Sequence, residues 1–266
     1  MSVELKSAVE LEGMRQSGRI NARVRRLLWD AIRPGVTGLE LDQLAKKAIE
    51  EHGAEPTFVG YAPMGKPPYP GAICYSVNEE LVHGIPAPGR RCRPGTTGPD
   101  RALQEGDIVT IDLGVTYKGW VSDAAFTAPV GEVSDEALVL VETTRRALWA
   151  GIDQMKAGNR LGDVSSAIGA VADGKYGIVT GYGGHGVGRK MHMEPHVPNY
   201  GRPGTGLRLQ PGLVLALEPM FSAGGAATEE VADEWTVVMA DGSLSAHWEE
   251  TVAITADGPE VLTRLD

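Results

Sequence analysis

Five residues of this chain have the types and local contexts of metal ligands: Asp112, Asp123, His185, Glu218 and Glu249. Four carboxylates and one imidazole form an oxygen-rich donor set that suits divalent cations. Two cations sharing a hydroxide can hydrolyse an unactivated amide bond, because a bound metal lowers the pKa of water to about 7. Without cations, the crowded carboxylates would repel one another strongly. The sequence therefore predicts a dinuclear hydrolytic site.

Asp112 and Asp123 belong to a predicted hairpin over residues 107–129, with arms 108–113 and 121–127 and a turn near Lys118-Gly119. An Asp within an apolar strand is costly unless it is paired or ligated. With this turn, Asp112 lies opposite Ala125, and Asp123 is its diagonal neighbour on the same face. The two carboxylates would then reach a common ion. The alternative is that both residues cap turns at strand ends.

The other candidate ligands lie near glycines or at strand ends. His185 is in a glycine-rich segment, 181–188, where small neighbours would let an imidazole approach a metal or substrate closely. His192 follows soon after and would be a second polar group beside the same cleft. Glu218 ends an apolar strand, 213–217, and Glu249 begins another. Since strand-end carboxylates can simply face water, these two assignments depend on the whole set.

The elements that must position these residues suggest two related halves. Helices are predicted over 9–32 and 39–52, and strands over 72–77, 235–239 and 251–254, with loops at 63–71 and 86–106. The pattern of residues 33–48 recurs in residues 156–171, a weak internal repeat that indicates two α/β halves facing each other. Chance similarity of amphipathic helices is the alternative. A mixed sheet flanked by helices, an α+β architecture, is the natural assembly.

Composition narrows the class of protein. The chain has 266 residues, 42% of them hydrophobic, and a net charge of −10, which argues against nucleic-acid or anionic-membrane binding. Cys74 and Cys92 form no disulfide framework and fit a reducing compartment. No apolar run is long enough to span a membrane, and the N-terminus lacks a secretory core. We expect a single catalytic domain, 1–266, in the cytoplasm, and a monomer.

The chain resembles the type I methionine aminopeptidases, whose fold is called pita-bread. The resemblance runs from residues 14–19 to 249–251 and is most specific at 76–86, in the hairpin, and at 184–189, 218–220 and 245–249. It implies a creatinase/aminopeptidase fold of pseudo-two-fold halves with a mixed, largely antiparallel sheet. It also implies an enzyme that removes the N-terminal methionine from nascent proteins when the second residue is small.

The resemblance assigns roles to the metal ligands. Asp112 would chelate one metal, whereas Asp123 and Glu249 would bridge both. His185 and Glu218 would complete the shell of the second metal, with Glu218 also the general base. The two divalent ions could be Co, Mn, Fe or Zn, since all accept this donor set.

The resemblance also assigns a substrate pocket. His83 and His192 would contact the scissile amide and the developing oxyanion. The methionine side chain would fit among Cys74, Tyr69 and Trp235. The substrate would be the N-terminus of a nascent polypeptide, with transient ribosome contact as a further possibility.

Type I is favoured because the short span between His185 and Glu218 leaves no room for the helical subdomain of type II enzymes. The chain departs from the family at Met191, where an aromatic is usual, at Glu250, where His is frequent, and in a longer loop over 87–105. The alternatives are an Xaa-Pro dipeptidase-like enzyme on the same fold and a non-catalytic pita-bread binding protein. The latter would have lost ligands, whereas this sequence keeps all five.

Overall fold

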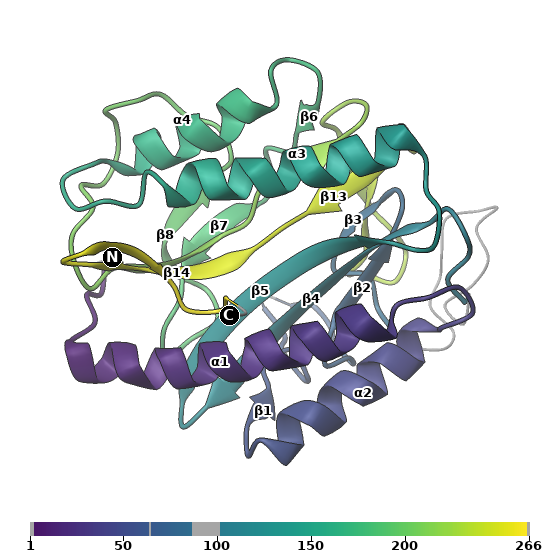
Figure 1. Ribbon diagram of the computed structural model, residues 1–266, viewed down its shortest axis with the longest axis horizontal. Helices are drawn as coiled ribbons and strands as arrows, with labels where there is room; N and C mark the ends of the chain where they lie inside the picture. Colours follow the sequence, from purple (N-terminus) through teal and green to yellow (C-terminus); the bar gives the residue numbers. More distant parts are fainter. Residues whose placement is uncertain (1–2, 64, 87–101, 265–266) are drawn as a thin grey trace.

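The computed structural model describes residues 3–63, 65–86 and 102–264. Its long helices form two pairs: α1 (Ala8–Ala31) with α2 (Gly38–Glu51), and α3 (Asp135–Ile152) with α4 (Leu161–Val171). One pair lies on each side of the strands (Figure 1). The helices predicted over 9–32 and 39–52 are confirmed, and the repeated pattern in residues 33–48 and 156–171 corresponds to the second helix of each pair.

Local sequence signals set the helix starts. Ser7 and Glu10 form a capping box at α1, where the Ser7 backbone N–H donates to Glu10 Oε2 at 2.8 Å. Thr37 and Glu40 do the same at α2, also at 2.8 Å. Each box satisfies backbone donors that have no partner inside the helix, and losing such a cap costs about 1 kcal/mol.

The predicted hairpin is confirmed as β4 (Ile108–Tyr117) and β5 (Trp120–Pro129), with arms longer than expected. Lys118 and Gly119 have φ angles of 49° and 76°, both positive as a tight primed hairpin turn requires. Asp112 pairs with Ala125, as predicted, and Asp123 lies opposite Gly114. Strands β1 (Glu55–Pro56) and β2 (Cys74–Val77) complete this sheet on β4.

A five-stranded sheet forms the other half, in the order β15 (Gly258–Val261), β14 (Glu250–Thr255), β9 (Val214–Leu217), β7 (Gly183–Gly186) and β8 (Met193–Pro198). Two small sheets connect the ends: β13 (Ser245–His247) with β10 (Met220–Ser222) and β6 (Gly177–Ile178), and β11 (Thr228–Glu230) with β12 (Val237–Met239) and β3 (Glu80–Val82). Every strand pairing within the described residues is antiparallel, so the sheets there are not mixed, contrary to our expectation. The α+β fold class is confirmed.

The halves join where β5 meets the start of β14, which lie side by side in Figure 1. The backbones of Ala125 and Glu249 exchange two hydrogen bonds, of 3.2 and 2.9 Å. Thr251 Oγ1 accepts from the Asp123 N–H at 2.9 Å and donates to the Asp123 carbonyl at 2.7 Å. The joint thus places two predicted ligands, one from each half, beside each other.

Each half has its own apolar core beneath its helix pair. Val109, Ile111 and Leu113 are buried against α1 and α2, and Leu215 and Leu217 belong to the core under α3 and α4. Among the described residues, no helix has the length and apolar character needed to cross a bilayer.

Candidate metal centre and substrate pocket

All five predicted ligands line one cavity of about 250 Å³ between the halves. Asp112 and Asp123 come from β4 and β5, and His185 comes from β7. Glu218 directly follows β9, and Glu249 directly precedes β14, one residue from the strand start that we expected. The first half thus contributes two of the five side chains and the second half contributes three.

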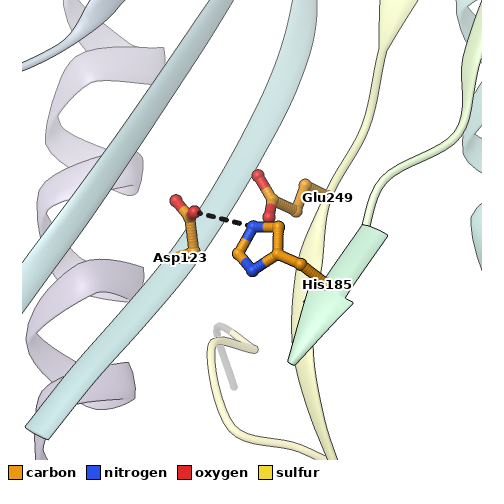
Figure 2. A group of neighbouring side chains, drawn as sticks. All are labelled: Asp123, His185 and Glu249. Carbon is orange, nitrogen blue, oxygen red and sulfur yellow. Dashed lines mark ion pairs between the residues drawn. The ribbon is translucent and has the colours of Figure 1, made fainter. Parts of the chain in front are cut away.

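Three of the five point toward one another in Figure 2. Asp123, His185 and Glu249 each offer a ligand atom, and these atoms lie within 4.8 Å of one another. His185 Nε2 is 3.6 Å from Asp123 Oδ2 and 3.8 Å from Glu218 Oε1. His185 Nδ1 is 3.0 Å from the Gly186 carbonyl oxygen, which can only accept. The proton of the neutral ring therefore belongs on Nδ1, leaving the Nε2 lone pair to face the carboxylates.

The glycines on either side of His185 are required by close packing against neighbouring strands, in addition to leaving space around the imidazole. A Cβ at Gly184 would lie 2.3 Å from the Ala216 carbonyl oxygen, and one at Gly186 would lie 2.2 Å from that of Glu194. Strand β7 is therefore pressed between the backbones of β9 and β8. Only glycine fits on either side of the imidazole, so its position is closely defined.

Three carboxylate oxygens of the cavity have no hydrogen-bond partner among the described residues. Asp112 Oδ1, Asp123 Oδ1 and Glu249 Oε1 are buried without a hydrogen-bond partner. Burial, and then the charge of Asp123, raises the pKa of Asp112 and of Glu249. Burial raises the pKa of Glu218 to about 8. Unpaired buried oxygens are costly, and divalent cations would satisfy them, so this donor set fits the two metal ions that we predicted.

The predicted methionine slot forms the closed end of the cavity. Tyr69, Cys74 and Trp235 are all buried there, and the rings of Tyr69 and Trp235 meet edge to face at 5.1 Å between centroids. Tyr69 Oη lies 2.7 Å from the Gly84 carbonyl oxygen, and Trp235 Nε1 donates to the Pro67 carbonyl at 3.1 Å. These bonds direct the polar tips into the walls and leave apolar ring surface facing the slot.

The two predicted catalytic histidines lie at different depths. His83 has a φ of 61° and packs its ring against Trp235 at 6.1 Å. Burial lowers the pKa of His83 to about 4. His192 is exposed at the mouth, 4.3 Å from the His185 ring, with Nδ1 2.7 Å from Tyr61 Oη. Desolvation by the pocket walls, and then the proximity of His185, lowers the pKa of His192 to about 4. Both rings are therefore neutral at pH 7.

Comparison with known proteins agrees with this geometry. A model of metallopeptidase family M24 matches residues 12–256. Methionine aminopeptidase 1 of Mycobacterium tuberculosis is 46% identical to the chain, covering 98% of this chain and 95% of its own length. The crystal structure of methionine aminopeptidase from Thermotoga maritima has a TM-score of 0.91 and 39% identity, covering 99% of this chain and all of that one.

The chain belongs to the methionine aminopeptidases of metallopeptidase family M24. Its resemblance to that family and its enzyme class, a metal-dependent hydrolase, are thereby confirmed. The prolidase of Pyrococcus furiosus, with a TM-score of 0.72 and 22% identity, shares the fold, and the chain covers 66% of its length. The dipeptidase alternative therefore rests on likeness of fold alone, whereas the aminopeptidase similarity extends over the full length.

The three departures from the methionine aminopeptidase pattern, Met191, Glu250 and the loop 87–105, lie in different parts of the chain relative to the cavity. Met191 is buried and lines the cavity, as expected of a pocket residue. Glu250 faces away from the cavity and pairs with Arg25 on α1. Residues 87–101, which make up most of the predicted long loop and include Cys92, lie outside the described residues.

Several side chains of the cavity are not among the residues expected from the sequence. The unpredicted lining residues include Phe58, Tyr61, Tyr182, His196 and Met220. Tyr182 and Met220 fall within two segments already singled out, 181–188 and 218–220, but no pattern in the sequence assigns any of the five to the cavity, because their strands and loops meet only in the fold. His247 also went without a role, although a signal existed, since it lies two positions before Glu249 and strand side chains alternate. Its buried Nε2 is 3.6 Å from Glu218 Oε2 and 3.9 Å from Glu249 Oε2.

Proposed function

We propose that this chain removes the N-terminal methionine from polypeptides whose second residue is small. The observation that carries the proposal is the composition of one cavity of about 250 Å³. It combines a donor set for two divalent cations with a closed slot lined by Tyr69, Cys74 and Trp235. The closed slot accepts a single side chain, and the acidic site beside it would hold the free α-amino group of the substrate, which restricts cleavage to the first peptide bond.

The five ligands divide in our proposal as the family resemblance implies. Asp112 would hold one cation, Asp123 and Glu249 would be shared by both, and His185 and Glu218 would complete the second. When bound, the cations polarise the scissile carbonyl and lower the pKa of water to about 7. The identity of the ions, Co, Mn, Fe or Zn, is a matter of supply as much as of ligand chemistry.

Glu218 is the proposed general base. Burial raises its pKa to about 8 when no cation is bound, and bound cations would favour the ionised carboxylate that a base requires. Its Oε1 faces His185 Nε2 at 3.8 Å, while Oε2 faces His247 at 3.6 Å. A proton accepted at Glu218 can be passed on to the departing amine, because the same group serves as base and then as acid.

His83 and His192 are the proposed donors to the reacting amide. Both are neutral at pH 7 because their pKa values are lowered to about 4, so each ring carries one N–H. With Tyr61 O–H donating to His192 Nδ1, the Nε2–H of His192 is left to stabilise the oxyanion. The side chain of the second substrate residue must pass beside these rings, which favours Gly, Ala and Ser.

The slot chemistry suits methionine. An unbranched, polarizable thioether fills an irregular space between aromatic faces and the Cys74 sulfur. One methylene more or less in such a slot is worth only about 1–3 kcal/mol, so partial acceptance of norleucine is expected.

The test is a peptide panel with metal-reconstituted protein. Met-Gly-Met-Met should be cleaved, Leu-Gly-Met-Met and Lys-Gly-Met-Met should be poor substrates, and Met-Arg-Met-Met should resist cleavage. Comparable rates for Met, Leu and Lys would indicate a broad aminopeptidase. Preferential cleavage of Gly-Pro peptides would favour the dipeptidase alternative. Purified protein that holds no metal and cleaves nothing would favour a binding protein.

We further propose that residues 1–266 act as one catalytic domain, as a cytoplasmic monomer, on nascent chains with transient ribosome contact. A free, buried Cys74 and a net charge of −10 support a reducing compartment and argue against a nucleic-acid surface. Sedimentation of the purified protein alone and with ribosomes tests the monomer and the contact separately.

A further inference from the structure

A second hollow, of about 380 Å³, adjoins the catalytic cavity. The two share Tyr61, Met191 and His192 in their linings, so they are continuous at the mouth. The hollow itself is bounded by Thr57 and Thr116, at the β1–β4 end of the first sheet, and by Arg189 and Lys190, which follow β7.

The hollow lies beside the mouth of the cavity, where a bound polypeptide would leave it. At the opposite end of the cavity, Tyr69 is 3% and Trp235 5% exposed, so a chain cannot leave there. His192 is exposed and hydrogen-bonded to Tyr61, and this pair forms the threshold between the two spaces. A substrate with its first side chain in the slot must direct its remaining residues outward, and the hollow lies next along that path.

The walls of the hollow are cationic. The Arg189 guanidinium lies 3.7 Å above the Trp120 ring, and its Nη1 donates to the Gly119 carbonyl at 3.3 Å, so its position is defined. Lys190 is exposed, and among the described residues no ion pair involves it. In the described part of the chain, none of the residues lining the hollow is a carboxylate. This is a local positive site on a protein of net charge −10.

We propose that this hollow receives the third and following residues of the polypeptide substrate and favours acidic side chains there. The proposal rests on the proposed function and extends it to residues beyond the second. Each further residue of an extended chain advances about 3.3–3.6 Å, so the residues after the second continue from the His192 threshold into the adjoining hollow. An exposed ion pair is worth roughly 0.2–1 kcal/mol, so the selectivity is a few-fold and sensitive to salt.

The experiment compares three amidated peptides, Met-Gly-Glu-Glu, Met-Gly-Ala-Ala and Met-Gly-Lys-Lys, by kcat/KM at low ionic strength. The expected order is Glu, Ala, Lys, with about a 2- to 10-fold span that shrinks in 0.5 M salt. Lys190→Met, which leaves Arg189, should narrow the span, and Lys190→Glu, which sets a carboxylate against Arg189, should flatten it. Lys47→Glu on the exposed face of α2 makes the same change in net charge and should leave the order unaltered.

Equal kcat/KM for the three peptides, or an order that Lys190→Glu leaves unchanged, overturns the proposal while the methionine-removal function stands. Cleavage of Met-Gly-Ala-Ala by each variant confirms that it is folded. Failure of wild-type protein to cleave any Met-Gly peptide would overturn the proposed function and this inference together.

Discussion

Glu249 and Glu250 are neighbours in the sequence, and both are buried, yet they meet different surroundings. Glu249 is 2% exposed and faces the cavity, where its Oε1 has no hydrogen-bond partner. Glu250 is 8% exposed and faces α1, where Arg25 Nη2 contacts its two carboxylate oxygens at 3.1 and 3.0 Å. The Thr263 hydroxyl also hydrogen-bonds Glu250.

Burial of a carboxylate therefore does not by itself indicate a role in metal binding. Consecutive side chains of an extended segment point to opposite faces, so the same stretch of chain serves two sites. Glu250 obtains cationic and hydroxyl partners within the protein and ties β14 to α1 and to the last described residues. Glu249, Asp112 and Asp123 retain oxygens without donors, and such oxygens indicate a binding site for cations.

Glu249 and Glu250 should differ most in their effect on bound metal. Glu249→Gln should lose metal and lower kcat/KM by more than about 10²-fold. Changing groups that only orient metal ligands already lowers metal affinity or activity by about 10–100-fold. Elemental analysis and peptide cleavage measure the two effects. Glu250→Gln is the matched control and should keep its metal. Full metal content and activity in Glu249→Gln would remove Glu249 from the ligand set.

Breaking the structural pair should mainly reduce stability. Glu250→Ala leaves the buried Arg25 guanidinium without its counter-charge, which costs about 3–5 kcal/mol in the free energy of unfolding. Urea denaturation measures this loss, and the folded fraction should keep its metal. The double variant Arg25→Met/Glu250→Leu should recover most of the stability. A loss below about 1 kcal/mol in the single variant would show that the pair is dispensable.

His192 lines the cavity but is not one of the five predicted ligands, so its replacement should affect catalysis without affecting metal binding. Removal of one oxyanion donor should lower kcat/KM by about 10²-fold while bound metal stays near the wild-type amount. His185→Ala should instead reduce occupancy of one metal site. If both variants lose metal equally, the role that we assign to His192 is wrong.

The smallest expected effect is a pH dependence of the metal-free protein. Burial raises the pKa of Glu218 from 4.5 to about 8, and raises those of Asp112 and Glu249 too. The folded state therefore holds carboxyl protons that the unfolded chain has released. Below about pH 6.5 the lowered pKa values of His83, His192 and His247 act in the opposite direction, so stability should fall as pH rises from about 6.5 through 8. Melting temperatures across this range measure the fall, and Mn²⁺ should remove most of it. A metal-free protein that gains stability over this range would contradict the assignment.

Some of the fold and site could be predicted because the signal was local. The Ser7/Glu10 and Thr37/Glu40 boxes mark helix starts, and Lys118-Gly119 fixes the hairpin register that puts Asp112 opposite Ala125. Tyr61 could not be placed in the same way, because it follows a short strand and reaches His192 only across the assembled halves.

Residue types and spacings along the chain were enough to predict the donor chemistry, the starts of α1 and α2, the hairpin turn and the family. Tertiary structure alone decided which buried carboxylates have partners, how His83 and His192 differ in depth, and that a cationic hollow continues from the mouth. Those features arise where distant segments meet, and the free energy of a charge depends on the neighbours that the fold brings to it.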